Sequence, residues 1–362
     1  MEILLALSVL KVPLGIKLFL NIIPVLIGLF YIVKQRRVDR LIAPALIMIF
    51  LNMVLGIYLK DWMTLIRLGQ LTCMLGFSYF ICDWINEERL LLVCRYMIII
   101  SCITFILEIF FKGAVSAKHI AFNFYLPRFE GPVGESNFTA IIFAVCSMVF
   151  FHYKKWMFSG LSFILIVLCA SRTSAIMVLL FIIFNLMFLK RRDYLRYVAG
   201  VMFFFMLISP FMIWLIERYA DLPIRSALER ASAGRYYLQV AYVDMGIKNI
   251  LGVGYFNGWN QFMEYLTPYL PIVDSIRTHQ NNEQHSIFIQ VFSEFGVIGY
   301  LFFIWQILNV CKMIMKQNAE LLFLISVVFF GYCFLNGLSD FILYLVIGAG
   351  MSLNLRKRLA DY

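Results

Sequence analysis

Long apolar runs, separated by short clusters of charged residues, dominate the chain. Residues 1–14 form an apolar stretch that predicts either a short interfacial segment or a twelfth, tilted span. A helix needs about 20 residues to cross a bilayer, and eleven further runs approach that length. They are 16–33, 41–59, 62–82, 90–111, 138–152, 157–171, 174–189, 197–216, 286–310, 319–336 and 338–354. The pattern predicts an all-α fold, a polytopic transmembrane helical bundle of about 11–12 spans, forming a single integral membrane domain over residues 1–362.

Two connections between these runs are long, at residues 112–137 and 217–285. The second is well above the usual length of a connection, and it carries most of the polar variety of the chain. Within it, 226–250 mixes apolar and polar residues at helical spacing, and Gly252 and Gly254 then break that pattern. We therefore predict one large, partly helical loop with a functional role.

The composition excludes an ordinary soluble enzyme and a disordered chain. The sequence is 62% hydrophobic and 14% charged, with a mean hydropathy of +0.86 and a net charge of +10. One set of alternating connections holds sixteen basic and seven acidic side chains, which predicts its cytoplasmic location by the positive-inside rule. The loops 112–137 and 217–285 are then extracytoplasmic, and 217–285 is close to neutral. Because the excess charge reports topology, no nucleic-acid partner is expected.

Several chemistries lack their usual residues. All eight cysteines lie within or beside apolar runs, which argues against a disulfide framework, a zinc site and a catalytic thiol. The chain has no Asp-x-Asp pair for a nucleotide sugar with Mg²⁺, no Gly-x-x-x-x-Gly-Lys loop and no His-Glu-x-x-His. A substrate must therefore arrive already activated, and we expect no metal and no cofactor.

Ionisable residues at membrane depth are costly and therefore candidates for function. Arg172 sits at the outer junction of two spans, where the alternative is a snorkelling residue that ends a helix. We expect interface placement for Glu108 and Arg67, and a helix cap for Asp340. Glu294 is expected about two turns into its span. None of these acids is assigned a catalytic role.

Three polar stretches of the predicted outer face occur in a distinctive order. They are 127–137 (Pro-Arg-Phe-Glu-Gly-Pro-Val-Gly-Glu-Ser-Asn), 171–174 (Ser-Arg-Thr-Ser), and Gly234-Arg235 followed by 249–254 (Asn-Ile-Leu-Gly-Val-Gly), His285 and Gly296. The set resembles the O-antigen polymerase and O-antigen ligase superfamily of bacterial envelope glycosyltransferases. In topology the resemblance extends over most of the chain, whereas in motif it is confined to these places.

The resemblance implies a multi-pass enzyme of the bacterial cytoplasmic (inner) membrane. It would transfer oligosaccharide from a polyprenyl diphosphate carrier to a hydroxyl, without a metal. Arg172 and Arg235 would neutralise the diphosphate, since guanidinium groups bind such oxygens in pairs. Arg128 and Asn137 are assigned to substrate binding. A base near neutrality suits His285, whose spacing to Gly296 favours it, while His279 offers a competing register.

Each assignment has a structural alternative. Arg128 is otherwise a headgroup anchor, Arg235 a loop residue paired with Glu229 or Asp244, and His285 a helix cap. The aromatic residues of the large loop would either stack on sugar rings or lie at the membrane interface. These residues are Tyr236, Tyr237, Tyr242, Tyr255, Phe256, Trp259, Tyr265 and Tyr269.

At the level of function, a polymerase of lipid-linked repeat units leads over an O-antigen ligase that uses lipid A core. The product would be O-antigen or a capsule-like polysaccharide. A polysaccharide flippase or small-solute transporter is the alternative from a different class, and a cell-wall glycan polymerase is a third. A transporter would place polar groups at the midplane of two matching halves, which this chain lacks. Expected partners are the polyprenyl-diphosphate-linked donor and acceptor and membrane lipids, with a chain-length regulator and a flippase as further candidates.

Overall fold

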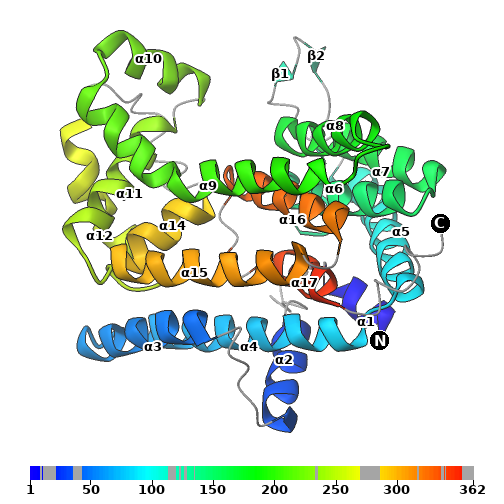
Figure 1. Cartoon of the computed structure of the whole chain (residues 1–362), viewed down its shortest axis with the longest axis horizontal. Helices are drawn as coiled ribbons and strands as arrows, with labels where there is room; N and C mark the ends of the chain where they lie inside the picture. The colour runs from blue at the N-terminus through cyan, green and yellow to red at the C-terminus, as the bar shows by residue number, and fades with distance from the viewer. Residues whose placement is uncertain are drawn as a thin grey trace.

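The computed structural model of the chain is a bundle of helices with two very short strands (Figure 1). The residues that it describes are 1–8, 10, 22–35, 43–112, 120–121, 124–125, 129–133, 135–232, 235–269, 286–315, 318–335, 338 and 340–352. The strands β1 (Ile120–Ala121) and β2 (Phe124–Tyr125) pair antiparallel.

The helices follow the apolar runs of the sequence. In the first half they are α1 (Glu2–Leu7), α2 (Ile22–Gln35), α3 (Ala43–Tyr58), α4 (Trp62–Trp84), α5 (Glu87–Lys112), α6 (Ser136–His152), α7 (Trp156–Leu168) and α8 (Arg172–Met187). In the second half they are α9 (Tyr194–Tyr219), α10 (Leu222–Ala231), α11 (Tyr236–Lys248), α12 (Gly258–Leu266), the 3₁₀ helix η1 (Thr267–Tyr269), α14 (Ile287–Glu294), α15 (Gly296–Met315), α16 (Ala319–Tyr332) and α17 (Phe341–Met351).

The predicted all-α membrane fold is confirmed. Among the described residues, four helices are long and apolar enough to cross a bilayer: Trp62–Trp84, Glu87–Glu108, Tyr194–Tyr219 and Gly296–Met315. The remaining predicted spans coincide with shorter apolar helices. In the segment 1–14, the described residues form only the six-residue helix α1.

One predicted span is wrong in its internal structure. The run 286–310 is divided into α14 and α15 at Gly296, whose φ of +71° lies in the left-handed region. A hydropathy pattern does not register such a break, because both pieces are apolar. Glu294 therefore does not lie two turns inside a continuous span. It is the last residue of the short helix α14.

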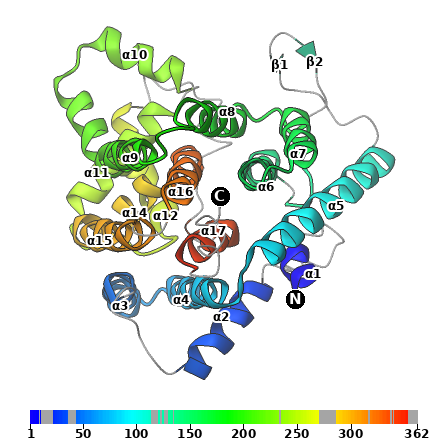
Figure 2. The same cartoon turned by 45° about the vertical axis from the view of Figure 1, so that its right-hand side comes forward.

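The core lies around three central helices. Almost every residue of α6, α16 and α17 is buried, and α16 packs against α6, α8, α9, α15 and α17 (Figure 2). The long helices α4, α9 and α15 surround them. Their outward faces carry large exposed apolar side chains such as Ile66, Phe204 and Trp305, as expected for surfaces in contact with lipid.

The connections predicted to be cytoplasmic meet one another. Glu320 lies at the start of α16, and its Oε2 is 2.6 Å from Nδ1 of His152 at the end of α6. The Glu320 carboxylate also forms an ion pair with Arg192. Nearby in the predicted topology, Ser352 Oγ donates to the Ile85 carbonyl at 3.3 Å. These contacts join connections that the charge pattern of the sequence assigns to the same side of the membrane.

The helices of the large loop gather at the opposite end of the bundle, at the left of Figure 1. Here α10, α11, α12 and α14 lie beside the end of α9 and the start of α15. The loop is not a loose cap, because α11 is almost entirely buried between α9, α12 and α14. At the crossing of α11 and α14, Gly246 allows the close approach of Phe292.

Candidate functional site

The structure describes three of the predicted site residues. Arg172 is the first residue of α8 and its side chain is exposed. Arg235 is the residue preceding α11 and is half-buried, and Asn137 lies half-buried in the first turn of α6. His285 and Arg128 lie outside the described residues, as does the competing His279. Their assignments stay predictions.

The backbone at Phe129 contacts the turn that carries Arg172. The Phe129 N–H, directly after Arg128 in the sequence, donates to the Leu168 carbonyl at 3.2 Å. Leu168 ends α7, and Arg172 begins α8 four residues later. The loop that follows Arg128 therefore docks against the α7–α8 turn that carries Arg172.

Arg235 lies on a different group of helices. Helix α11 packs against α9, α12 and α14, whereas α8 packs against α6, α7 and α16. The two groups are linked through α9 and α16, which pack against each other. The structure thus brings Phe129 into contact with the α7–α8 turn that carries Arg172. Arg235 precedes α11, which belongs to the other group of helices.

The backbone N–H groups at the start of α11 already have partners. Ser232 Oγ accepts from the Arg235 N–H at 3.2 Å and from the Tyr236 N–H at 2.9 Å. Glu229 Oε2 accepts from the Tyr237 N–H at 3.2 Å. A helix N-terminus binds anions through free N–H groups. Because these three N–H groups are occupied, they are not available to an anion at this place.

A carboxylate at the end of α9 binds both neighbouring helices. Glu217 Oε1 accepts from Arg225 Nη1 of α10 at 2.8 Å, and Glu217 Oε2 accepts from the Tyr236 hydroxyl of α11 at 3.1 Å. The hydrogen bond to Glu217 raises the pKa of the Arg225 guanidinium. Burial, together with the negative charge of Glu217, raises the pKa of the Tyr236 phenol. Both groups therefore keep their protons and stay donors near neutral pH.

Most of the loop tyrosines have a packing role. Tyr236, Tyr237, Tyr242 and Tyr255 are buried, so neither sugar stacking nor interface placement describes them. Tyr242 stacks on Phe262 of α12 with ring centroids 4.6 Å apart. Their burial explains why this polar-looking loop folds as a compact layer, since each buried aromatic ring removes a large apolar area from water.

Tyr269, Tyr265 and Phe256 are less buried than these four tyrosines. The Tyr269 ring stacks on the buried Tyr237 with centroids 5.6 Å apart, and the Tyr269 hydroxyl donates to Asp244 Oδ2 at 2.8 Å. The Asn249 side chain donates to the Tyr265 hydroxyl at 3.0 Å. Phe256 is exposed and lies under the Arg67 guanidinium, 4.8 Å from its ring centroid.

The glycine motifs bring two segments of the sequence into contact. Gly252, Gly254 and Gly296 all have positive φ, and the Gly254 N–H donates to the Glu294 carbonyl at 3.1 Å. A Cβ on Gly252 would collide with that carbonyl, and a Cβ on Gly296 would collide with the backbone of Ile250. Gly296 therefore marks the docking point of the 249–254 turn.

Asn52 is a buried polar residue whose structural role sequence reasoning missed. This side chain is buried in α3, where its Oδ1 accepts from the Tyr255 N–H at 2.8 Å and its Nδ2 donates to the Glu294 carbonyl at 3.2 Å. Thr64 Oγ1 donates to the Tyr255 carbonyl at 2.9 Å. The available signal was a single Asn within the apolar run 41–59. A buried amide of that kind requires polar partners.

Glu108 differs from its predicted placement at the membrane interface. It is buried at the end of α5, where its carboxylate accepts from the backbone N–H groups of Glu130 and Gly131 at 3.4 and 3.1 Å. It thereby anchors the loop that follows Arg128. Asp340 fulfils its prediction, because its carboxylate caps α17 by accepting from the Ile342 N–H at 3.1 Å.

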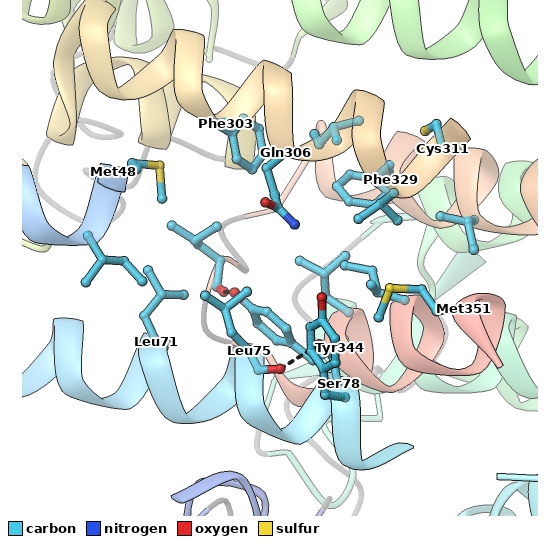
Figure 3. Close-up of a pocket in the computed structure, with 18 of the residues that line it drawn as sticks. Met48, Leu71, Leu75, Ser78, Phe303, Gln306, Cys311, Phe329, Tyr344 and Met351 are labelled. Atoms are coloured by element: carbon cyan, nitrogen blue, oxygen red, sulfur yellow. Dashed lines mark hydrogen bonds between the residues drawn. The ribbon is translucent and has the colours of Figure 1, made fainter. Parts of the chain in front are cut away.

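An apolar cavity lies away from these residues, between α3, α4, α9, α15, α16 and α17. It holds about 760 Å³ of space, partly open to the surroundings, and its lining is nearly all apolar. Figure 3 shows the amide of Gln306 pointing into it between Phe303 and Leu75. Within the described residues, Gln306 Oε1 has no hydrogen-bond partner. The cavity suits a hydrocarbon chain and not a sugar or a diphosphate.

A metal site needs a group of at least three metal-ligating side chains, namely His, Cys, Asp or Glu. Among the described residues there is no such group. None of the eight cysteines, all of which are described, forms a disulfide.

Comparison with known proteins identifies the nature of one region. Residues 157–304 match the model of a protein family described as O-antigen ligase. The matched segment runs from α7 into α15 and contains Arg172, Arg235 and position 285, while Arg128 and Asn137 precede it. No curated protein and no solved structure gives a match. The predicted resemblance is confirmed over this segment.

Proposed function

We propose that this multi-pass membrane protein is a glycosyltransferase that polymerises polyprenyl-diphosphate-linked oligosaccharide repeat units at the outer face of the bacterial cytoplasmic membrane. The observation that carries the proposal is the O-antigen ligase match over 157–304, because it contains two of the arginines and the histidine selected from the sequence. The apolar helices of a multi-pass membrane protein fit a lipid-linked substrate.

The proposed chemistry needs few groups. The acceptor hydroxyl attacks the anomeric carbon of the donor, and a new glycosidic C–O bond forms. The C–O bond to the diphosphate breaks, and the polyprenyl diphosphate leaves with the electron pair. His285 takes the hydroxyl proton, since an imidazole titrates near neutrality. Arg172 and Arg235 neutralise the diphosphate, whose charge grows as it leaves.

The state of the α11 N-terminus supports the role of Arg235. The backbone N–H groups of residues 235–237 are bound to Ser232 and Glu229 and do not serve an anion there, so we assign recognition of the diphosphate to the Arg235 side chain. The hydrocarbon part of the donor has a chemically suitable environment in the apolar cavity that Gln306 and Phe303 line.

The second candidate is an O-antigen ligase, which transfers the glycan to lipid A core. The description of the matching family favours it. Both reactions use the same donor chemistry and differ in the acceptor hydroxyl. Polymerase and ligase are therefore separated by the product and not by the proposed residues.

The test uses purified protein in lipid nanodiscs with lipid-linked repeat units, with and without lipid A core and with EDTA throughout. We expect a ladder of elongated glycan from the wild type and a loss of about 100-fold or more for His285→Ala. Product only with lipid A core would select the ligase. Movement of substrate across vesicles without any glycosidic bond would overturn both candidates in favour of a transporter.

A further inference from the structure

Glu217 is the one acidic residue of the long helix α9. Its carboxylate links α9 to α10 and α11. Its two oxygens accept from Arg225 of α10 at 2.8 Å and from the Tyr236 hydroxyl of α11 at 3.1 Å. The side chain of Glu217 is 16% exposed. Bonds of this kind, with one or both partners charged and partly shielded from water, are stronger than ordinary surface hydrogen bonds.

The links continue from α10 to the start of α11. Ser232 Oγ, at the end of α10, accepts from the N–H groups of Arg235 and Tyr236, and Glu229 accepts from the Tyr237 N–H. The backbone of Arg235 is therefore held by α10, and α10 is held by Glu217 through Arg225. Tyr236, the residue next to Arg235, is held by Glu217 directly.

This arrangement holds the backbone at Arg235, from which the guanidinium extends. Helix α10 is largely exposed, with Leu222 and Ile224 more than half accessible, so packing alone gives it little support. Because α9 is a long apolar helix packed against α16, Glu217 connects the Arg235 backbone to the rigid part of the bundle. Sites that bind a charged group tightly need such support for their ligating side chains.

We propose that Glu217 is a positioning residue that sets the Arg235 guanidinium in place for the diphosphate of the donor, acting through Arg225 and Tyr236. This inference rests on the proposed function, because it assigns Glu217 to the donor site of that reaction. The high pKa values of Arg225 and Tyr236 are consistent with it, since both donors stay protonated throughout the neutral range.

The first experiment compares two tyrosines that make the same kind of bond. Tyr236→Phe removes the hydroxyl bound to Glu217, and Tyr269→Phe removes the hydroxyl that donates to Asp244 at 2.8 Å, a bond that does not involve Glu217. We expect kcat/KM for the lipid-linked donor to fall about fivefold in Tyr236→Phe and less than twofold in Tyr269→Phe. Equal losses in the two variants would overturn the inference.

The second experiment is a double-mutant cycle between Glu217→Gln and Arg235→Lys, which keeps the positive charge and leaves measurable turnover. Alone, Glu217→Gln should lower kcat/KM about tenfold, and in the Arg235→Lys background it should lower it less than twofold. The same tenfold loss in both backgrounds would show a merely structural role. Restoration of at least half the activity by Glu217→Asp would support positioning by charge.

The cycle also separates this inference from the proposed function. If Arg235→Ala elongates glycan at the wild-type rate, the role of Arg235 fails and the positioning role fails with it. If Arg235→Ala is impaired while Glu217→Gln and Tyr236→Phe are both at wild-type rate, only the positioning role fails. Melting temperatures of all variants, measured in the same detergent, show that the compared proteins are folded.

Discussion

Two carboxylates, Glu320 and Glu217, join helices at opposite ends of the bundle, and their surroundings differ. Glu320 binds His152 and Arg192, which ties α6, α16 and the turn before α9 together at the predicted cytoplasmic end. Glu217 ties α9, α10 and α11 together at the other end. Both make the same type of bridge.

The difference lies in burial and in the neighbours. The side chains of Glu320 and His152 are 10% and 4% exposed, and their partners include none of the predicted site residues that the structure describes. Glu217 is more accessible, and its partner Tyr236 is adjacent to Arg235 in the chain. We therefore expect the burial of each bridge to determine how much it contributes to stability. We expect its neighbouring residues to determine whether it contributes to activity.

The largest effect is expected from Glu320→Ala. This change leaves His152 buried without its partner, and loss of a hydrogen bond to a carboxylate costs about 1.5–3 kcal/mol. We expect a clear fall in apparent melting temperature in detergent and unchanged specific activity of the protein that remains folded. A variant with wild-type thermal stability would show that this bridge does not hold the helices.

Glu217→Gln sharpens the contrast from the other side. The amide keeps the shape of the side chain and one acceptor, so we expect a loss of stability of only about 1 kcal/mol, well below that of Glu320→Ala. Its activity should nevertheless fall as described above. If thermal denaturation of Glu217→Gln resembled that of Glu320→Ala, the two bridges would be equivalent and the contrast would be broken.

The smallest effect is expected from Arg192→Ala. The Arg192 side chain is 51% exposed, and an ion pair of a solvent-accessible arginine is worth about 0–1 kcal/mol. His152 remains as the buried partner of Glu320. We expect a shift of melting temperature close to the error of the measurement, and a shift as large as that of Glu320→Ala would show that Arg192 carries the bridge.

Much of the fold was predictable, because helices that face lipid must be long, apolar and free of charge. The break at Gly296 was not, since it depends on a left-handed residue that contacts Gly252, which is 44 positions earlier. The burial of α11 was also missed. Its tyrosines have the composition of an interfacial loop, and only the packing against α9 and α14 reveals their role.

The candidate site was predictable in part. The arginines stood out because they lie in an ordered set of polar stretches on the predicted outer face, and the match over 157–304 contains two of them. Their supports did not stand out. Asn52, Glu108 and Glu217 act through backbone groups or neighbours far away in the sequence, and no local spacing relates them.

The proposed mechanism requires that the Arg235 side chain, and not the α11 helix end, recognises the diphosphate. Its test is the inhibition constant of free polyprenyl diphosphate for glycan elongation, measured in the wild type and in Arg235→Ala. Arg230→Ala is the matched control, because Arg230 is an exposed arginine on the adjacent helix α10. We predict that the inhibition constant rises about 100-fold in Arg235→Ala and stays within twofold in Arg230→Ala. An inhibition constant unchanged in Arg235→Ala would contradict the claim.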